Sequence, residues 1–280
     1  MLFRSEGALR AWAEIADLMP LEVIADVQLS RVRARLNRTL PELDMPSLKG
    51  RIGWRRAEGR MEFYTRGLEL TTEGNLRLPA TDLHYVELDA GRLRPASGSI
   101  KANVIDIVPL ASIADHLPFD AEQRKRLIAL APKGRLTDVG VTWEGTWPTP
   151  AKYSAQARFA GLAVNRWEGL PGLTGIGGRI EATERGGMME LDASVVKFDM
   201  PFLFKSVLDF DTLKGEARWT RTGNGFELKL DNVRYANADL AGELKGGYKS
   251  VPGRPGIADF QGALTRANAR QVMRYVPLQA

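Results

Sequence analysis

Apolar and polar residues alternate with a period of two along most of the chain. The clearest runs are MEFYT at 61–65, DVGVTW at 138–143 and FELKL at 226–230, and a weaker one contains Val86 and Leu88. Successive side chains of a strand point to opposite faces, so each run predicts a half-buried strand. Gly, Asn or Pro separates the runs at intervals of roughly eight to twelve residues, which is typical of antiparallel hairpins. The pattern therefore predicts a mainly β protein.

Helical spacing is found in two regions. Between Ser5 and Met19, apolar residues recur at steps of three and four, and Pro20 follows directly. Between 108 and 131, Asp120 and Gln123 form a capping-box-like start after a first short helix. We therefore expect an N-terminal helical segment over 1–22. A repeated β segment over 23–280, with a helical hairpin at 108–131, follows it, and the whole is expected to belong to a longer protein.

The strand pattern also repeats within the chain. Two stretches share the same features in the same order: a Leu-Lys-Gly triplet, a tryptophan and a later residue pair. One constant offset in residue number aligns the two stretches. The matching positions are Leu48-Lys49-Gly50, Trp54 and Gly67-Leu68 in the first stretch, and Leu213-Lys214-Gly215, Trp219 and Asn232-Val233 in the second. Residues 134–162 and 175–191 resemble weaker copies. Repeated hairpins that cannot bury an apolar face alone indicate an elongated sheet in which neighbours supply the core. Chance similarity between glycine-punctuated hairpins is the alternative.

Composition removes several classes of function. The 280 residues include no cysteine and two histidines, which excludes disulfides and thiolate chemistry and leaves little for metal sites. With 39 basic and 34 acidic residues, the net charge of +5 is too small an excess to indicate a nucleic-acid-binding protein. The longest uncharged run is 169–178, too short for a membrane-spanning helix.

No motif of a known catalytic site is present. The chain lacks a Walker A loop, a nucleophile elbow and an HExxH sequence. Asp209 and Asp211 share one strand face, which suits a cation or a hydrolase, but the exposed face of a strand ordinarily carries such residues. Arg31, Arg33 and Arg35 form a basic stripe that suits lipid phosphates or a protected sheet edge. We expect no enzyme, no cofactor and no metal.

A series of short motifs, in order and spacing, resembles the central region of the YhdP family, large AsmA-like proteins of Gram-negative bacteria. The resemblance covers roughly Val23 to Pro277. The motifs are Val27-Gln28-Leu29, Arg33-Ala34-Arg35-Leu36, Leu40-Pro41-Glu42-Leu43, Leu48-Lys49-Gly50-Arg51, Trp54, Pro109-Leu110-Ala111, Ala131-Pro132-Lys133-Gly134, Phe159-Ala160-Gly161-Leu162, Leu170-Pro171-Gly172-Leu173, Asn237-Ala238-Asp239 and Arg274-Tyr275-Val276-Pro277. Family members are longer and carry an N-terminal membrane anchor, so the resemblance implies a fragment.

The resemblance implies a periplasmic bridge, anchored in the inner membrane by a segment outside this chain. In such a bridge a curved antiparallel sheet forms an open apolar groove that carries phospholipid acyl chains towards the outer membrane. No nucleic-acid partner is implied. The apolar members of the alternating pairs are the expected lining: Met61, Phe63, Leu68, Leu70, Val141, Trp143, Phe159, Leu162, Val164, Met189, Leu191, Phe226, Leu228 and Leu230.

A structural or protein-binding β-rich scaffold with a closed core is the alternative function. The two hypotheses differ in whether the alternating apolar face is exposed or wholly buried. The expected helical hairpin packs across one mouth or edge of the sheet in the first hypothesis, and is a plain crossover otherwise.

Overall fold

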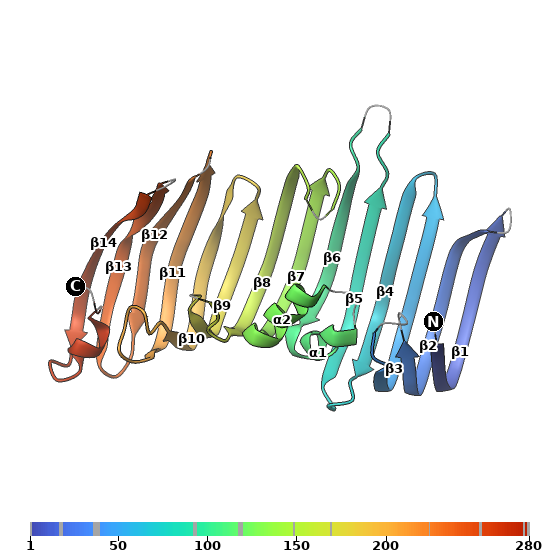
Figure 1. Ribbon diagram of the computed structural model, residues 1–280, viewed down its shortest axis with the longest axis horizontal. Coiled ribbons are helices and arrows are strands. Elements are labelled where there is room, and N and C mark those ends of the chain that lie inside the picture. The colour runs from blue at the N-terminus through green and yellow to red at the C-terminus, as the bar shows by residue number, and fades with distance from the viewer. Residues whose placement is uncertain are drawn as a thin grey trace. The chain divides into compact units, whose positions relative to one another are not determined.

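The computed structural model describes residues 2–16, 19–35, 40–91, 94–116, 120–147, 149–168, 170–223, 225–251, 254–276 and 278. Over these residues fourteen strands form one open antiparallel sheet, in which each strand pairs with its neighbours in sequence (Figure 1). The mainly β prediction is therefore confirmed. The strands are β1 (Leu2–Ala16), β2 (Met19–Arg35), β3 (Leu43–Ala57), β4 (Arg60–Thr71), β5 (Arg77–Leu88), β6 (Ser97–Asp106), β7 (Lys133–Glu144), β8 (Lys152–Val164), β9 (Gly172–Thr183), β10 (Gly186–Asp199), β11 (Leu208–Thr222), β12 (Gly225–Ala236), β13 (Leu240–Val251) and β14 (Arg254–Ala267).

Two short α-helices lie between β6 and β7, as predicted for 108–131. They are α1 (Ile107–Ser112) and α2 (Ala121–Leu130), with the 3₁₀ turn η1 (Ala114–His116) between them. The capping box also forms: the Gln123 amide donates to Asp120 Oδ1 at 2.7 Å, and the Asp120 amide donates to Gln123 Oε1 at 3.2 Å. A second 3₁₀ turn, η2 (Val272–Tyr275), follows β14.

The predicted N-terminal helix is wrong, because the segment forms strand β1. Leu9, Ala11 and Ala13 pair with residues of β2 along an antiparallel ladder. β1 is an edge strand with apolar side chains on both faces, and both Leu9 and Trp12 are exposed. Such a strand lacks clean alternation, so its spacing imitates a helix. The ladder with β2 overrides local helix propensity.

Seven of the fourteen described strands contain a residue with a left-handed backbone away from their ends, and there the alternation shifts by one residue. In β2, Leu29 is followed by left-handed Arg31 and then Val32, and both apolar side chains join the same core cluster. This is the signature of a β-bulge, which inserts one residue without moving the apolar side chains to the other face. Positive φ angles between 48° and 80° occur at Arg31, Gly67, Asp138, Gly161, Gly175, Val195 and Asn232.

The sequence repeat corresponds to a repeated contact between a glycine and the bulge of the next strand. Gly50 (φ 140°) and Gly215 (φ 158°) adopt backbone conformations that L-residues rarely adopt. A Cβ at Gly50 would lie 2.7 Å from the Leu68 Cα, and one at Gly215 would lie 2.6 Å from the Val233 Cα. The two hairpins β3–β4 and β11–β12 therefore share the same local geometry, for which only glycine leaves room.

The chain divides into two compact units. Unit 1 contains Met1–Ile128 and Arg135–Ser154, and unit 2 contains Ala129–Gly134 and Ala155–Ala280. Each unit has its own hydrophobic cluster on one face of its strands. The cluster of unit 1 consists of Val27, Leu29, Val32, Leu43, Met45, Leu70, Leu78 and Ile113, and that of unit 2 consists of Ala193, Val196, Leu213 and Val233.

Candidate functional site

The strand register places the expected lining residues of unit 1 on one face. Directly opposed residues of antiparallel strands project from the same face of a sheet. One row of such partners crosses five strands and consists of Trp54, Phe63, Tyr85, Ile100 and Val141. We call the surface that contains this row the apolar face of unit 1.

The neighbouring row belongs to the same face and contains the expected residues Met61 and Trp143. Met61 pairs with Glu87, which pairs with Gly98, which in turn pairs with Trp143. Beyond the bulge at Gly67, Leu68 and Leu70 also lie on this face, because Leu70 joins the core cluster. All six expected residues of unit 1 are therefore on one face.

Three strands of unit 2 bring together a second group of expected residues. Met189 and Leu230 both pair with Ala217 of β11. Leu228 pairs with Trp219 in the adjacent row, and Leu191 with Gly215. Phe226 lies two residues before Leu228, near the start of β12, so alternation places it on the same face. We call this surface, which continues to Tyr248 opposite Leu228, the apolar face of unit 2.

Strand β8 carries three of the expected residues, of which Phe159 precedes its bulge and Leu162 and Val164 follow it. Phe159 is buried, whereas Leu162 and Val164 are half-buried. Gly161 lies between Phe159 and Leu162 and has the left-handed conformation. These two residues are therefore related across a bulge in the same way as Thr65 and Leu68 across Gly67 in β4. A Cβ at Gly134 would lie 2.9 Å from the Leu162 Cα, which makes this pair a third example of the repeated contact.

Burial separates the expected residues into anchors and accessible positions. Leu70, Trp143 and Phe159 are buried, and the others are half-buried except Phe226, which is 38% exposed. Trp143 lies across Gly98, where a Cβ would be 2.1 Å from the indole ring. Trp219 covers Gly187 in the same way. These tryptophans fill the gaps left by glycines, so the surface that a ligand can reach is formed mainly by the half-buried aliphatic and phenylalanine side chains.

Tyr85 and Ile100 were not among the expected lining residues. The HYVEL run at 84–88 allows either alternate set to face the core, so alternation alone does not select Tyr85 over Val86. Instead Val86 pairs with Glu62 on the opposite face. Tyr85 packs against Trp143 with ring centroids 5.9 Å apart and donates a hydrogen bond to Glu87 at 2.9 Å. Burial, together with this carboxylate, raises the pKa of Tyr85 to about 12.

The opposite face of unit 1, which we call its polar face, carries ion pairs. Arg51 donates to both carboxylate oxygens of Asp26, at 2.6 and 2.9 Å, and this contact lowers the pKa of Asp26. His84 Nε2 lies 2.5 Å from Glu62 Oε1, and this hydrogen bond is the main reason why the pKa of Glu62 is lowered. The two faces therefore differ in chemistry as the alternation predicts.

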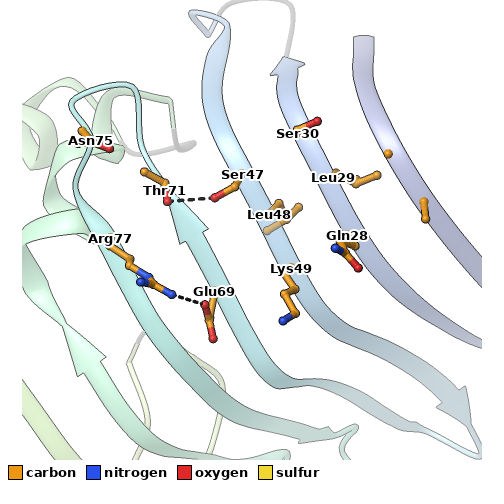
Figure 2. A pocket seen from close by; sticks show the side chains of 12 residues that line it. Gln28, Leu29, Ser30, Ser47, Leu48, Lys49, Glu69, Thr71, Asn75 and Arg77 are labelled. Atoms are coloured by element: carbon orange, nitrogen blue, oxygen red, sulfur yellow. Dashed lines mark hydrogen bonds and ion pairs between the residues drawn. The ribbon is translucent and has the colours of Figure 1, made fainter.

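A depression of about 1000 Å³ lies on the polar face of unit 1 (Figure 2). Ser47 Oγ donates to Thr71 Oγ1 at 3.0 Å, and Arg77 pairs with Glu69 at 2.8 Å across it. Lys49 lies on the same surface. Eight of its twelve lining residues carry a hydroxyl, amide or charged group, although apolar atoms form most of its exposed surface.

The helical segment covers part of the apolar face of unit 1. Ile113 is buried in the core cluster with Leu70 and Leu78, and Leu110 packs against the same cluster. The part of the segment at α1 therefore removes apolar surface at one end of these strands from water, whereas Ile128 of α2 is 65% exposed.

The groups weighed as catalytic or metal-binding candidates lie apart. Asp209 pairs with Arg274 at 3.3 Å, whereas Asp211 is exposed. His84 pairs with Glu62, and His116 lies in η1. Within the described ranges, no three His, Cys, Asp or Glu residues gather as metal ligands. Among those residues there is also no helix that is long and apolar enough to cross a membrane.

These features define a class: an open, single-layer antiparallel β-protein whose strands present one apolar and one polar face. The comparison with protein families is more specific, because the family described as YhdP protein matches residues 2–280. The chain therefore belongs to the YhdP family. Neither the comparison with curated proteins nor that with solved structures found a match.

Proposed function

We propose that the chain is a non-enzymatic segment of a bridge that carries phospholipids between the inner and outer membranes. The YhdP family is a lipid-transport family without known catalytic activity. In this proposal the apolar faces of the two units hold the acyl chains, and the polar faces stay in water. The periplasmic location, and attachment to the inner membrane through a segment outside this chain, are inferred from the family.

The observation that carries the proposal is the set of half-buried apolar rows on an open sheet. The row from Trp54 to Val141 crosses five neighbouring strands. An acyl chain gains about 0.8 kcal/mol for each methylene group removed from water. A surface of apolar side chains several strands wide can therefore hold such a chain without specific hydrogen bonds, and it leaves the charged headgroup outside.

The lining in this proposal is the expected set, with the buried members as supports. Phe63, Val141, Leu228 and Leu230 are half-buried and available for contact, whereas Trp143 and Phe159 fix the shape of the surface. The competing function, a scaffold that binds protein through other surfaces, requires these half-buried rows to be covered by further polypeptide in the working molecule.

Two adjacent residues of β12 provide a matched test. Leu228 is half-buried on the apolar face of unit 2, and Lys229 is exposed on the other face. We expect Leu228→Asp in the full-length parent protein to abolish lipid transfer to the outer membrane while circular dichroism reports a retained fold. A carboxylate on the path of an acyl chain costs several kcal/mol of desolvation. Lys229→Asp is expected to leave transfer intact.

Photo-crosslinking completes the test. Benzoylphenylalanine at Phe63 or Leu228 should capture phospholipid, and the same probe at Glu62 or Lys229 should not. Equal capture from both faces would reject the face assignment. Normal transfer by folded Leu228→Asp protein would reject a conduit over this segment, and capture of polypeptide alone from Phe63 and Leu228 would favour the scaffold.

A further inference from the structure

An apolar surface remains at one end of the strands of unit 2, outside the apolar face. It is formed by the connection between β10 and β11, residues 200–207, and by the described residues after β14, 268–276 and 278. Both lie at the same end of the strands in Figure 1, and the Leu278 amide donates to the Leu203 carbonyl at 2.8 Å. We call these two segments the end surface.

The segment after β14 is held firmly by its polar groups. Arg274 contacts Asp209 at 3.3 Å and Asp239 at 3.4 Å. The hydroxyl of Tyr275 accepts a hydrogen bond from the amide of Asn237 at 2.7 Å, and the Tyr275 ring packs against Phe210. The position of η2 is therefore defined by contacts with β11 and with the turn before β13.

The same segments expose their apolar side chains. Phe202 is 47% exposed and Leu203 is 39% exposed, and both lie within a tight turn closed by hydrogen bonds to the Met200 carbonyl. Met273 is 70% exposed while its neighbour Arg274 points into the ion-pair cluster. Surface helices normally bury apolar residues and expose charged ones, so the end surface has the reverse arrangement. Clustered exposed apolar residues of this kind mark contact surfaces.

The charges of these segments point to an anionic partner. Residues 200–207 and 268–278 contain Lys205, Arg270 and Arg274 and no acidic residue. Lys205 and Arg270 are exposed, and neither has an ion-pair partner among the described residues. Phenylalanine and long aliphatic side chains next to free basic groups are the combination that binds the interface of an anionic bilayer.

We infer that the end surface docks on the headgroup region of an anionic lipid bilayer. Phe202 and Leu203 enter the interface, and Lys205 and Arg270 contact the phosphates. This contact differs from the binding of single acyl chains on the apolar faces, because it needs a membrane surface and uses neither face. Membrane docking by the end surface can therefore be tested independently of the proposed conduit.

Vesicle sedimentation of the whole chain tests the inference. We expect binding to vesicles of phosphatidylethanolamine with phosphatidylglycerol, and at least about tenfold weaker binding of the double variant Phe202→Ser, Leu203→Ser. Lys205→Glu with Arg270→Glu should weaken binding to these vesicles and abolish its dependence on ionic strength. The control Ile128→Ser removes an apolar side chain that is 65% exposed in α2 and should change nothing.

The outcomes separate the alternatives. Binding that is equal for the wild type and the Phe202→Ser, Leu203→Ser variant would overturn the inference, as would absence of vesicle binding by the wild type. Self-association in analytical ultracentrifugation that the same double variant abolishes, without vesicle binding, would assign the surface to a second copy of the chain. If the Phe202→Ser, Leu203→Ser variant loses vesicle binding but a photo-crosslinker at Leu228 still captures lipid, docking and the conduit are separate functions.

Discussion

The two units share one feature inside the sheet, a bulge followed by a buried valine. They differ in how the ends of their strands are covered. In each unit a left-handed residue, Arg31 or Val195, is followed by a valine, Val32 or Val196, that is 0% exposed. The end of unit 1 is covered by a helical segment that buries apolar Ile113. The segment after β14 in unit 2 is instead held by polar contacts and exposes its apolar side chains. The strand geometry is thus the constrained part, and the end segments are free to acquire separate roles.

We expect the largest loss of stability from substitution of the glycines that contact the bulge of the next strand. Gly50→Ala and Gly215→Ala each force a Cβ against the backbone of the next strand and impose an unfavourable φ. We expect the free energy of unfolding to fall by about 3 kcal/mol in each variant, measured by urea denaturation. Gly74→Ala is the control, because the nearest atom to its added Cβ is 3.9 Å away. Equal stability of the Gly50 and Gly74 variants would contradict the required close approach.

The buried valines test whether the two cores are equivalent. Val32→Ala and Val196→Ala each remove two methyl groups from a fully buried site, and we expect each to cost about 2 kcal/mol of unfolding free energy. Val195→Ala is the neighbouring control, since Val195 is 70% exposed. A loss at Val196 that is no greater than at Val195 would show that unit 2 does not depend on this core.

The residues at the bulges offer a stabilising change. Val195 is β-branched and has a φ of 56°, which is strained for such a side chain. We expect Val195→Gly to raise the free energy of unfolding by about 1 kcal/mol, because Gly adopts this conformation without steric cost. Gly67→Val in the corresponding position of β4 should have the opposite sign. Thermal denaturation of the two variants side by side gives the comparison, and the same sign for both would refute it.

The smallest effect concerns pH and distinguishes the two related hairpins. The hydrogen bond from His84 lowers the pKa of Glu62, so the folded state releases this proton more readily than the unfolded state. The resulting stability is present above the ordinary glutamate pKa of about 4.3 and is lost as the pH falls through the lower, folded value. Glu62→Gln should flatten the decline of the urea midpoint in this acidic range.

The corresponding position in the second hairpin provides the control. Glu227 occupies the place of Glu62 in β12 and is exposed. Glu227→Gln should leave the pH profile unchanged. A profile that responds equally to both substitutions would show that the contact with His84 does not contribute.

Strand alternation and the glycine repeat were sufficient to predict the hairpin sheet and the common face of residues such as Phe63 and Val141. Alternation could not predict bulges at Arg31 or Val195, because these residues do not favour a left-handed backbone, and only the ladder with neighbouring strands imposes it. Tyr85 was not predicted as a lining residue because the short run at 84–88 fits both registers. The N-terminal strand was missed because its pairing with β2 is not visible in its own spacing.

The order of the strands has a consequence for how such a chain changes in evolution. Each strand is hydrogen-bonded in the sheet to its sequence neighbours, so a hairpin can be duplicated or deleted without rethreading any other part. One hairpin adds two strand spacings, about 10 Å, to the sheet. Duplication or deletion of hairpins in the gene can therefore change the span of such a protein in nearly uniform steps.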